Sequence, residues 1–145
     1  MANPLLFKSA VVFGTFHILL AIQYAPLILE LTLILGVITS IYNHGTTSAF
    51  AKWLDRVAIT LASITDLIYI FFLPESLVLI VILLFSVTIF LYFAAKWDIK
   101  RGGNGNIYHL WSHILATILH SVILLYMIEH PSILFTPGWT MLPLD

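Results

Sequence analysis

Three histidines in this sequence have a spacing that suits a metal site. His109 and His113 are four residues apart, so a helix would place both rings on one face. His44 ends an earlier apolar segment, and Ser40 lies four residues before it. Three protein ligands and one open position are typical of a catalytic zinc ion. We therefore predict that His44, His109 and His113 bind zinc.

Two further side chains are candidates for catalysis at such a site. Asp55 follows His44 by eleven residues, and a carboxylate that is not a ligand can act as a general base toward metal-activated water. The Ser40 hydroxyl can hydrogen-bond that water or a developing oxyanion. Taken singly, each residue has a simpler explanation, such as a histidine bonded to a loop carbonyl, or Asp55 paired with Arg56 or with the helix dipole. We favour a common metal site over these separate explanations, because the predicted spans place all of these residues at one depth in the membrane.

The elements that must position these residues are membrane-spanning helices. The chain has 145 residues, of which 61% are hydrophobic and 9% charged, whereas soluble domains are about 45–50% apolar and about 25% charged. A soluble domain of this length could not bury so much apolar surface. The absence of cysteine excludes disulfides and thiol chemistry. With six basic and seven acidic residues, the chain also lacks the positive charge that would attract nucleic acid. We predict an all-α, polytopic transmembrane bundle.

Charged residues, prolines and glycines divide the chain into about five spans. The predicted spans are 5–23, 26–43, 53–73, 76–95 and 107–128, with a polar loop over 96–106 and an interfacial tail over 129–145. Five spans place every basic residue on one face, namely Lys8, Lys52, Arg56, Lys96, Lys100 and Arg101. Positive charge in short loops marks the cytoplasmic side. We therefore expect a cytoplasmic N-terminus and a metal site near the cytoplasmic face.

Three more ionisable residues, His17, Asp66 and His120, lie deeper in the predicted spans. His120 follows His113 by seven residues and lies about 10 Å deeper on the same side of its helix. One interpretation is a cavity beneath the metal, lined by these three residues, that admits water or a lipid headgroup. The other is a buried histidine–aspartate pair that holds the helices together.

The pattern as a whole resembles the CREST superfamily of membrane hydrolases. The residues that carry the resemblance are Ser40-x3-His44, Asp55 eleven residues later, and His109-x3-His113. The superfamily includes the alkaline ceramidases, the progestin and adiponectin receptors with the hemolysin III-type proteins, and the myomaker group. The serine–histidine–aspartate spacing resembles the ceramidases most closely. Residues 52–59 and the inferred orientation of the N-terminus resemble hemolysin III instead.

The resemblance covers about residues 36–125 and implies a zinc-dependent hydrolase of lipid amides such as ceramide. It implies the three histidines as zinc ligands, with Asp55 and Ser40 in contact with the water on the metal. The family has seven spans, three of them between the aspartate helix and the last histidine pair, where this chain has room for one. We therefore expect a shortened bundle whose lipid cavity is smaller or is completed by a partner, such as a second copy of the chain.

Other functions fit parts of the pattern. A receptor or scaffold would keep zinc for structure alone and would suit the reduced helix count. Histidines at two depths also permit haem, which a Soret band would reveal. A proton or ion channel through His17, Asp66 and His120 would need a polar outlet at the opposite face, and the sequence has none. For the hydrolase we expect a membrane lipid, either an amide or an ester, as substrate.

Overall fold

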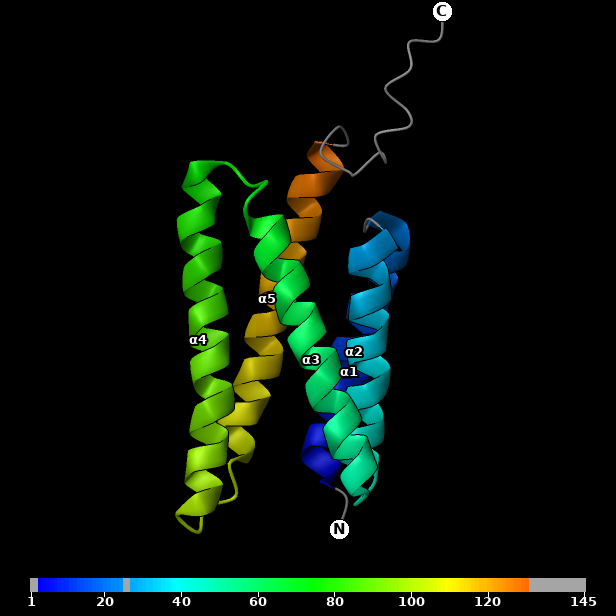
Figure 1. The fold of residues 1–145 in the computed structure, drawn as a ribbon, viewed down its shortest axis with the longest axis vertical. Helices are drawn as coiled ribbons and strands as arrows, with labels where there is room; N and C mark the ends of the chain where they lie inside the picture. The colour runs from blue at the N-terminus through cyan, green and yellow to red at the C-terminus, as the bar shows by residue number, and fades with distance from the viewer. Residues whose placement is uncertain (1–2, 25–26, 131–145) are drawn as a thin grey trace, which may run out of the picture.

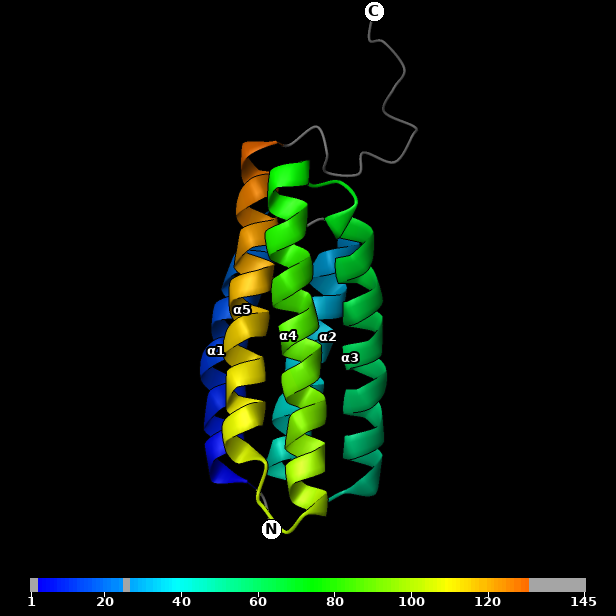
Figure 2. The same ribbon diagram turned by 90° about the vertical axis from the view of Figure 1, so that its left-hand side faces the viewer.

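The computed structural model of this chain is a bundle of five helices that run up and down in turn (Figures 1 and 2). The helices are α1 (Pro4–Tyr24), α2 (Leu27–Gly45), α3 (Ala49–Ile70), α4 (Glu75–Lys100) and α5 (Asn106–Glu129). The structure describes residues 3–24 and 27–130, and this part of the chain contains no strand. The all-helical fold class predicted from composition is confirmed.

The helices form an open ring in the order α3, α2, α1, α5, α4. Each packs along its neighbours in that order, and α3 meets α4 and α5 at few positions only. The close approach of α1 to α2 depends on Gly14, where an added Cβ would lie 2.5 Å from the Val37 Cγ1 atom. The packing of α1 on α5 brings residues from the two ends of the sequence side by side, which matters for the site.

The apolar core occupies the half of the bundle where α1 and α3 end and α2 and α4 begin. Its members are the buried residues Ala21, Leu29, Leu33, Tyr69, Ile70, Leu73, Val81, Leu119, Ile123, Leu124 and Met127. The buried polar residues lie from the middle of the bundle toward the opposite end, and they include Ser9, His17, His44, Asp55, Asp66 and His120. Tight apolar packing therefore holds one half of the bundle together, while the other half contains the polar site.

Four of the described helices are long and apolar enough to cross a membrane, namely α1, α2, α4 and α5. The third predicted span, α3, is not among them, and it carries four charged residues, Lys52, Asp55, Arg56 and Asp66. Both of its carboxylates are only 4% exposed. The helix therefore turns these two acidic side chains toward the bundle, while large apolar side chains such as Leu61 and Ile64 remain exposed on its surface.

Two helices begin or end beyond the predicted spans. Residues 96–100, predicted as loop, continue α4. α3 begins at Ala49 because Ser48 caps it, with the Ser48 hydroxyl accepting a hydrogen bond from the Ala51 N–H at 3.3 Å. The predicted turn at 25–26 and residues 131–145 of the predicted interfacial tail lie outside the described residues.

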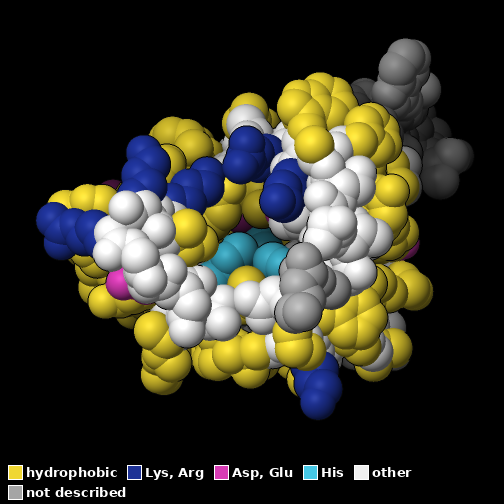
Figure 3. All heavy atoms as spheres, turned by 90° about the horizontal axis from the view of Figure 1, so that it is seen from below, with side chains coloured by type: hydrophobic (Ala, Val, Ile, Leu, Met, Phe, Trp, Pro, Cys, Tyr) yellow, Lys and Arg dark blue, Asp and Glu magenta, His cyan; other side chains and the backbone are white. Residues whose placement is uncertain are grey.

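The basic residues gather at one end of the bundle, here called the basic end. Lys8 lies near the start of α1, Lys52 and Arg56 lie in the first turns of α3, and the other three lie at the end of α4 and directly after it. Figure 3 looks onto this end and shows basic side chains around a central hollow, in which histidines are visible. The hollow at the basic end therefore exposes histidine side chains.

Candidate metal centre

The three histidines predicted as ligands lie together at the basic end. His44 is in the last turn of α2, while His109 and His113 are in the first two turns of α5. Their ring centroids are 4.9 to 5.6 Å apart. One candidate ligand nitrogen from each residue can be chosen such that all three lie within 4.8 Å of one another. Because α2 ends where α5 begins, residues far apart in the sequence form one compact cluster.

The turn between α4 and α5 fixes the position of His109. Gly102 and Gly105 have φ values of +90° and +66°, which glycine adopts far more easily than other residues. The Asp98 carboxylate accepts a hydrogen bond from the Gly105 N–H at 2.8 Å. A Cβ at Gly105 would lie 2.5 Å from the Ala95 carbonyl oxygen. The glycine-rich run thus lets α5 begin directly against the end of α4.

Asn3 connects the two helices that carry the histidines. Its backbone N–H donates to the His44 carbonyl at 3.2 Å, and its side-chain amide donates to the Asn106 Oδ1 atom at 2.6 Å. The Asn3 Oδ1 atom accepts from the Leu6 N–H at 3.2 Å. One residue therefore joins the start of α1 to the end of α2 and the start of α5. Sequence reasoning missed it, because an isolated asparagine before an apolar span has no metal-site signature.

Ser9 contacts one of the two ring nitrogens of His113. The Ser9 Oγ atom lies 3.0 Å from the His113 Nδ1 atom, and the same hydroxyl donates its single proton to the Leu6 carbonyl at 2.9 Å. While the hydroxyl donates to Leu6, it accepts from His113, and this arrangement favours the tautomer with the ring proton on Nδ1 and a free Nε2 atom. A metal needs an unprotonated nitrogen, and a hydrogen bond on the other ring nitrogen is the usual support of a metal-binding histidine.

The donor set fits a metal ion. The Nε2 atom of His44 is buried and has no hydrogen-bond partner. Most buried polar atoms have a partner, and leaving one unpaired costs about 1–3 kcal/mol. A metal ion bound at this nitrogen would satisfy it. Imidazole ligands suit zinc and other transition metals, whereas magnesium and calcium prefer oxygen ligands.

The two candidate catalytic residues lie in different surroundings. Ser40 lines a cavity that His109 and His113 also line. Asp55 is not among the residues that line this cavity. It is buried between α3 and α2, where the side-chain amide of Asn43 donates to its Oδ2 atom at 2.8 Å, and its Oδ1 atom has no hydrogen-bond partner. Asp55 is therefore linked to the metal centre through the residue that precedes His44.

The cavity has a volume of about 170 Å³, and all five helices contribute to its lining. Most of its walls are apolar, with polar side chains near the basic end and deeper in the bundle. The deeper residues are His17, Asp66 and His120, all three of which line the same cavity as His109 and His113. A water molecule needs roughly 10–15 Å³ of such space, so the cavity has room for several waters or for part of a ligand.

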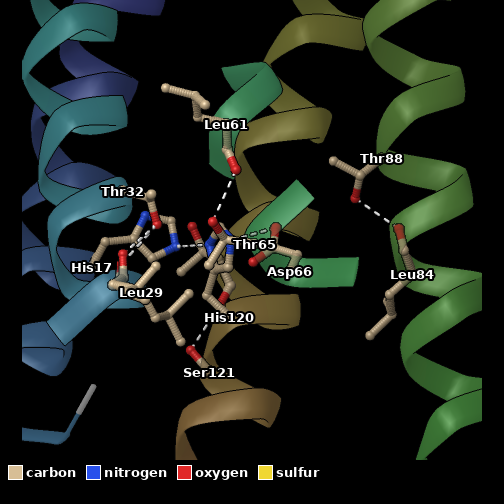
Figure 4. A network of polar contacts seen from close by, with 12 residues as sticks. His17, Leu29, Thr32, Leu61, Thr65, Asp66, Leu84, Thr88, His120 and Ser121 are labelled. Atoms are coloured by element: carbon tan, nitrogen blue, oxygen red, sulfur yellow. Dashed lines mark hydrogen bonds and ion pairs between the residues drawn. The ribbon is translucent and has the colours of Figure 1, made fainter. Parts of the chain in front are cut away.

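The three deeper residues form a hydrogen-bonded chain across three helices (Figure 4). The His120 Nε2 atom lies 3.0 Å from the Asp66 Oδ2 atom, and its Nδ1 atom lies 3.1 Å from the His17 Nε2 atom. The histidine–aspartate pair expected to hold helices together is thus present, linking α5 to α3. Because the same residues line the cavity, the structural interpretation and the cavity interpretation apply together.

Comparison of this chain with protein-family models, with curated proteins and with solved structures finds no match in any of the three.

The Ser9–His113 contact leads to a first testable prediction. We expect Ser9→Ala to weaken zinc binding roughly 10- to 100-fold, as loss of a hydrogen bond behind a metal-binding histidine usually does. Ser121→Ala is the matched control, because the Ser121 hydroxyl also donates to its own helix, at 2.8 Å from the Thr117 carbonyl. Competition with a zinc-binding fluorophore would measure both affinities. Equal weakening in the two variants would contradict the role of Ser9.

Proposed function

We propose that this chain is a zinc-dependent integral-membrane hydrolase that acts on a lipid amide or ester. The supporting observation is the cluster of His44, His109 and His113, of which His109 and His113 line an apolar-walled cavity. Zinc bound there would supply an activated water and polarise a carbonyl group. The described residues provide three ligands in this cluster, and three protein ligands with one open position are typical of catalytic zinc.

The chain's own residues would bind the metal and position the lipid. Ser9 contacts the Nδ1 atom of His113 and would favour the tautomer whose Nε2 atom is free for the metal. Ser40, on the cavity wall, can donate its hydroxyl proton to the carbonyl oxygen of the lipid. Asp55 is the candidate proton acceptor, because Asn43 holds its Oδ2 atom and leaves Oδ1 without a partner. The apolar walls exclude bulk water, which strengthens the polar interactions inside.

In this proposal the basic end faces the cytoplasm, because lysine and arginine in short connections mark that side of a membrane. The metal centre then lies near the cytoplasmic surface, and the cavity extends toward the middle of the membrane. Residues of both α3 and α4 line the cavity, yet these helices meet at few positions. A lipid chain can therefore enter between them, and a second copy of the chain is the partner we would expect to complete this wall.

A receptor or scaffold with a structural zinc ion is the second candidate function. The observation that favours it is the position of Asp55, which is absent from the cavity lining. A general base must come within hydrogen-bond reach of the water it activates. The two functions differ in one property, since the hydrolase alone turns over a lipid.

The first experiment is elemental analysis of the protein purified in detergent, followed by a screen of lipid amides and esters. We expect about one zinc ion per chain, as for a single site with three protein ligands, and release of a fatty acid from at least one lipid class. A well-folded protein without zinc would overturn the hydrolase. Bound zinc with no hydrolysis of any lipid amide or ester would favour the receptor or scaffold instead.

A further inference from the structure

The basic residues are distributed unevenly among the helices at the basic end. Of the six, only Lys8 belongs to α1, whereas the other five lie on α3, on α4 or directly after α4. These two helices both line the cavity and meet each other at few positions. Figure 3 shows most of the basic side chains along one side of the hollow. The positive charge is therefore concentrated on the two helices between which we propose that the lipid enters.

The orientation of the chain in the membrane does not by itself explain this distribution. The preference for positive charge on the cytoplasmic side does not determine which helices carry it, and residues 46–48, which connect α2 to α3 at this end, contain no lysine or arginine. Within residues 3–24 and 27–130, no lysine or arginine has an ion-pair partner. All of the basic side chains are exposed except that of Lys96, which is half-buried. Their charges are thus available to an anionic ligand.

Lys96 connects the basic side chains with the metal centre. Its amino group lies 4.1 Å from the centre of the Tyr92 ring. Tyr92 lines the cavity, and its ring meets the His109 ring edge-on with the two centroids 6.0 Å apart. Lys96 also interacts electrostatically with both His109 and Asp55. An anion bound at this amino group would therefore lie beside the cavity and close to the histidine cluster.

A lipid phosphate is the anion that suits this place. Lysine and arginine bind phosphate through charge-assisted hydrogen bonds, and basic clusters at the cytoplasmic ends of membrane spans bind anionic headgroups. In a phospholipid, only a few bonds separate the phosphate from the carbonyl groups of the acyl chains. One molecule can therefore place its phosphate at Lys96, a carbonyl group at the metal centre and an acyl chain in the apolar-walled cavity.

We propose that Lys96 binds the phosphate headgroup of the lipid substrate beside the metal centre, and that Lys52 and Arg56 of α3 add positive charge on the other side of the lipid entry. The inference rests on the proposed function, which places the lipid carbonyl at the metal centre. It narrows the substrate class to an amide or ester lipid with an anionic phosphate headgroup.

Three lipids with the same two acyl chains test this inference on the unaltered protein. Phosphatidic acid has an anionic phosphate, phosphatidylcholine has a phosphate that choline neutralises, and diacylglycerol has no phosphate. We expect phosphatidic acid to bind roughly fivefold or more tightly than the other two, because each lysine or arginine near an anionic lipid contributes about that factor. Titration of the purified protein in a neutral detergent, followed by thermal shift, would measure this. Equal binding of all three would overturn the proposal.

Lys96→Gln gives a second, sharper test. We expect it to reduce the preference for phosphatidic acid roughly fivefold, whereas Lys96→Arg should retain the preference because the charge remains. Lys8→Gln is the matched control, because it removes one charge from the same end of the bundle but lies on α1. An equal loss in Lys8→Gln would assign the preference to the general charge of this end and overturn the proposal. If Lys96→Gln does not fold, Arg56→Gln makes the same comparison from α3, and an unchanged preference there would overturn the proposal.

The two proposals can fail separately, because the titrations measure binding and not turnover. A protein without zinc that still prefers phosphatidic acid, and loses this preference in Lys96→Gln, would overturn the hydrolase and support the Lys96 site. A zinc protein that hydrolyses lipids without any preference for an anionic headgroup would support the hydrolase and overturn the Lys96 site. A preference that His44→Ala abolishes and Lys96→Gln leaves unchanged would place the phosphate on the metal and also overturn the Lys96 site.

Discussion

His44→Ala and His113→Ala are each expected to remove zinc from the purified protein. Each substitution leaves two histidines of a cluster whose three ligand nitrogens lie within 4.8 Å of one another, and two are too few for the usual zinc site in proteins. His130→Ala is the matched control, because His130 is exposed at the far end of α5. Elemental analysis of the three variants makes the comparison. Zinc retained in both cluster variants, or lost in the control, would contradict the assignment.

Thermal stability gives the same prediction a second readout with a definite sign. A metal that binds only the folded state stabilises it, by about 2.7 kcal/mol when its free concentration is 100 times the dissociation constant. A chelator should therefore lower the Tm of the parent protein and leave the Tm of His44→Ala unchanged. In the absence of metal, the His44 Nε2 atom is buried without a hydrogen-bond partner, which is unfavourable. Removing this atom in His44→Ala should therefore not lower the Tm of the metal-free protein. A Tm that is insensitive to chelation in the parent would contradict a bound metal.

The helices could be predicted because charged residues, prolines and glycines interrupt the apolar runs at nearly every connection. The predicted loop over 96–100 is wrong, because a run of charged residues does not by itself end a helix. Long basic side chains can stay on a helix while their charges reach water. The Lys96 amino group lies 4.1 Å from the centre of the Tyr92 ring, and the Arg101 guanidinium lies 3.9 Å from the Trp97 ring. The aromatic rings of α4 thus accommodate the basic residues at its end.

Only those parts of the site that depend on spacing within one helix could be predicted from the sequence. His109 and His113 could be paired from the sequence because residues four apart lie on the same face of a helix. Ser9 contacts His113 across 104 positions of sequence, and this contact exists only because α1 packs on α5. Neither composition nor the number of spans determines which helices are neighbours. For the same reason the bond between Asn43 and Asp55 could not be expected, although both residues lie near predicted helix ends.

Asp55→Asn is expected to keep zinc and to lose turnover by roughly 100- to 10,000-fold, the usual contribution of a general acid–base group. The variant side chain has the same shape, and its amide oxygen can still accept the hydrogen bond from Asn43, which is 2.8 Å long in the parent. The position of the Oδ1 atom, which has no partner in the parent, would then hold an NH₂ group that cannot take up a proton. Zinc content and the rate of lipid hydrolysis, measured on the same preparation, make the test.

Glu75→Gln is the matched control for Asp55→Asn, because it also removes one carboxylate but lies at the start of α4, at the opposite end of the bundle from the metal centre. We expect the control to retain both zinc and turnover. Full activity in Asp55→Asn would assign this residue a structural role between α2 and α3, in keeping with its absence from the cavity lining. The proton acceptor would then have to be another group that reaches the cavity. Loss of zinc together with activity would instead show that Asp55 supports the metal centre through Asn43 and His44.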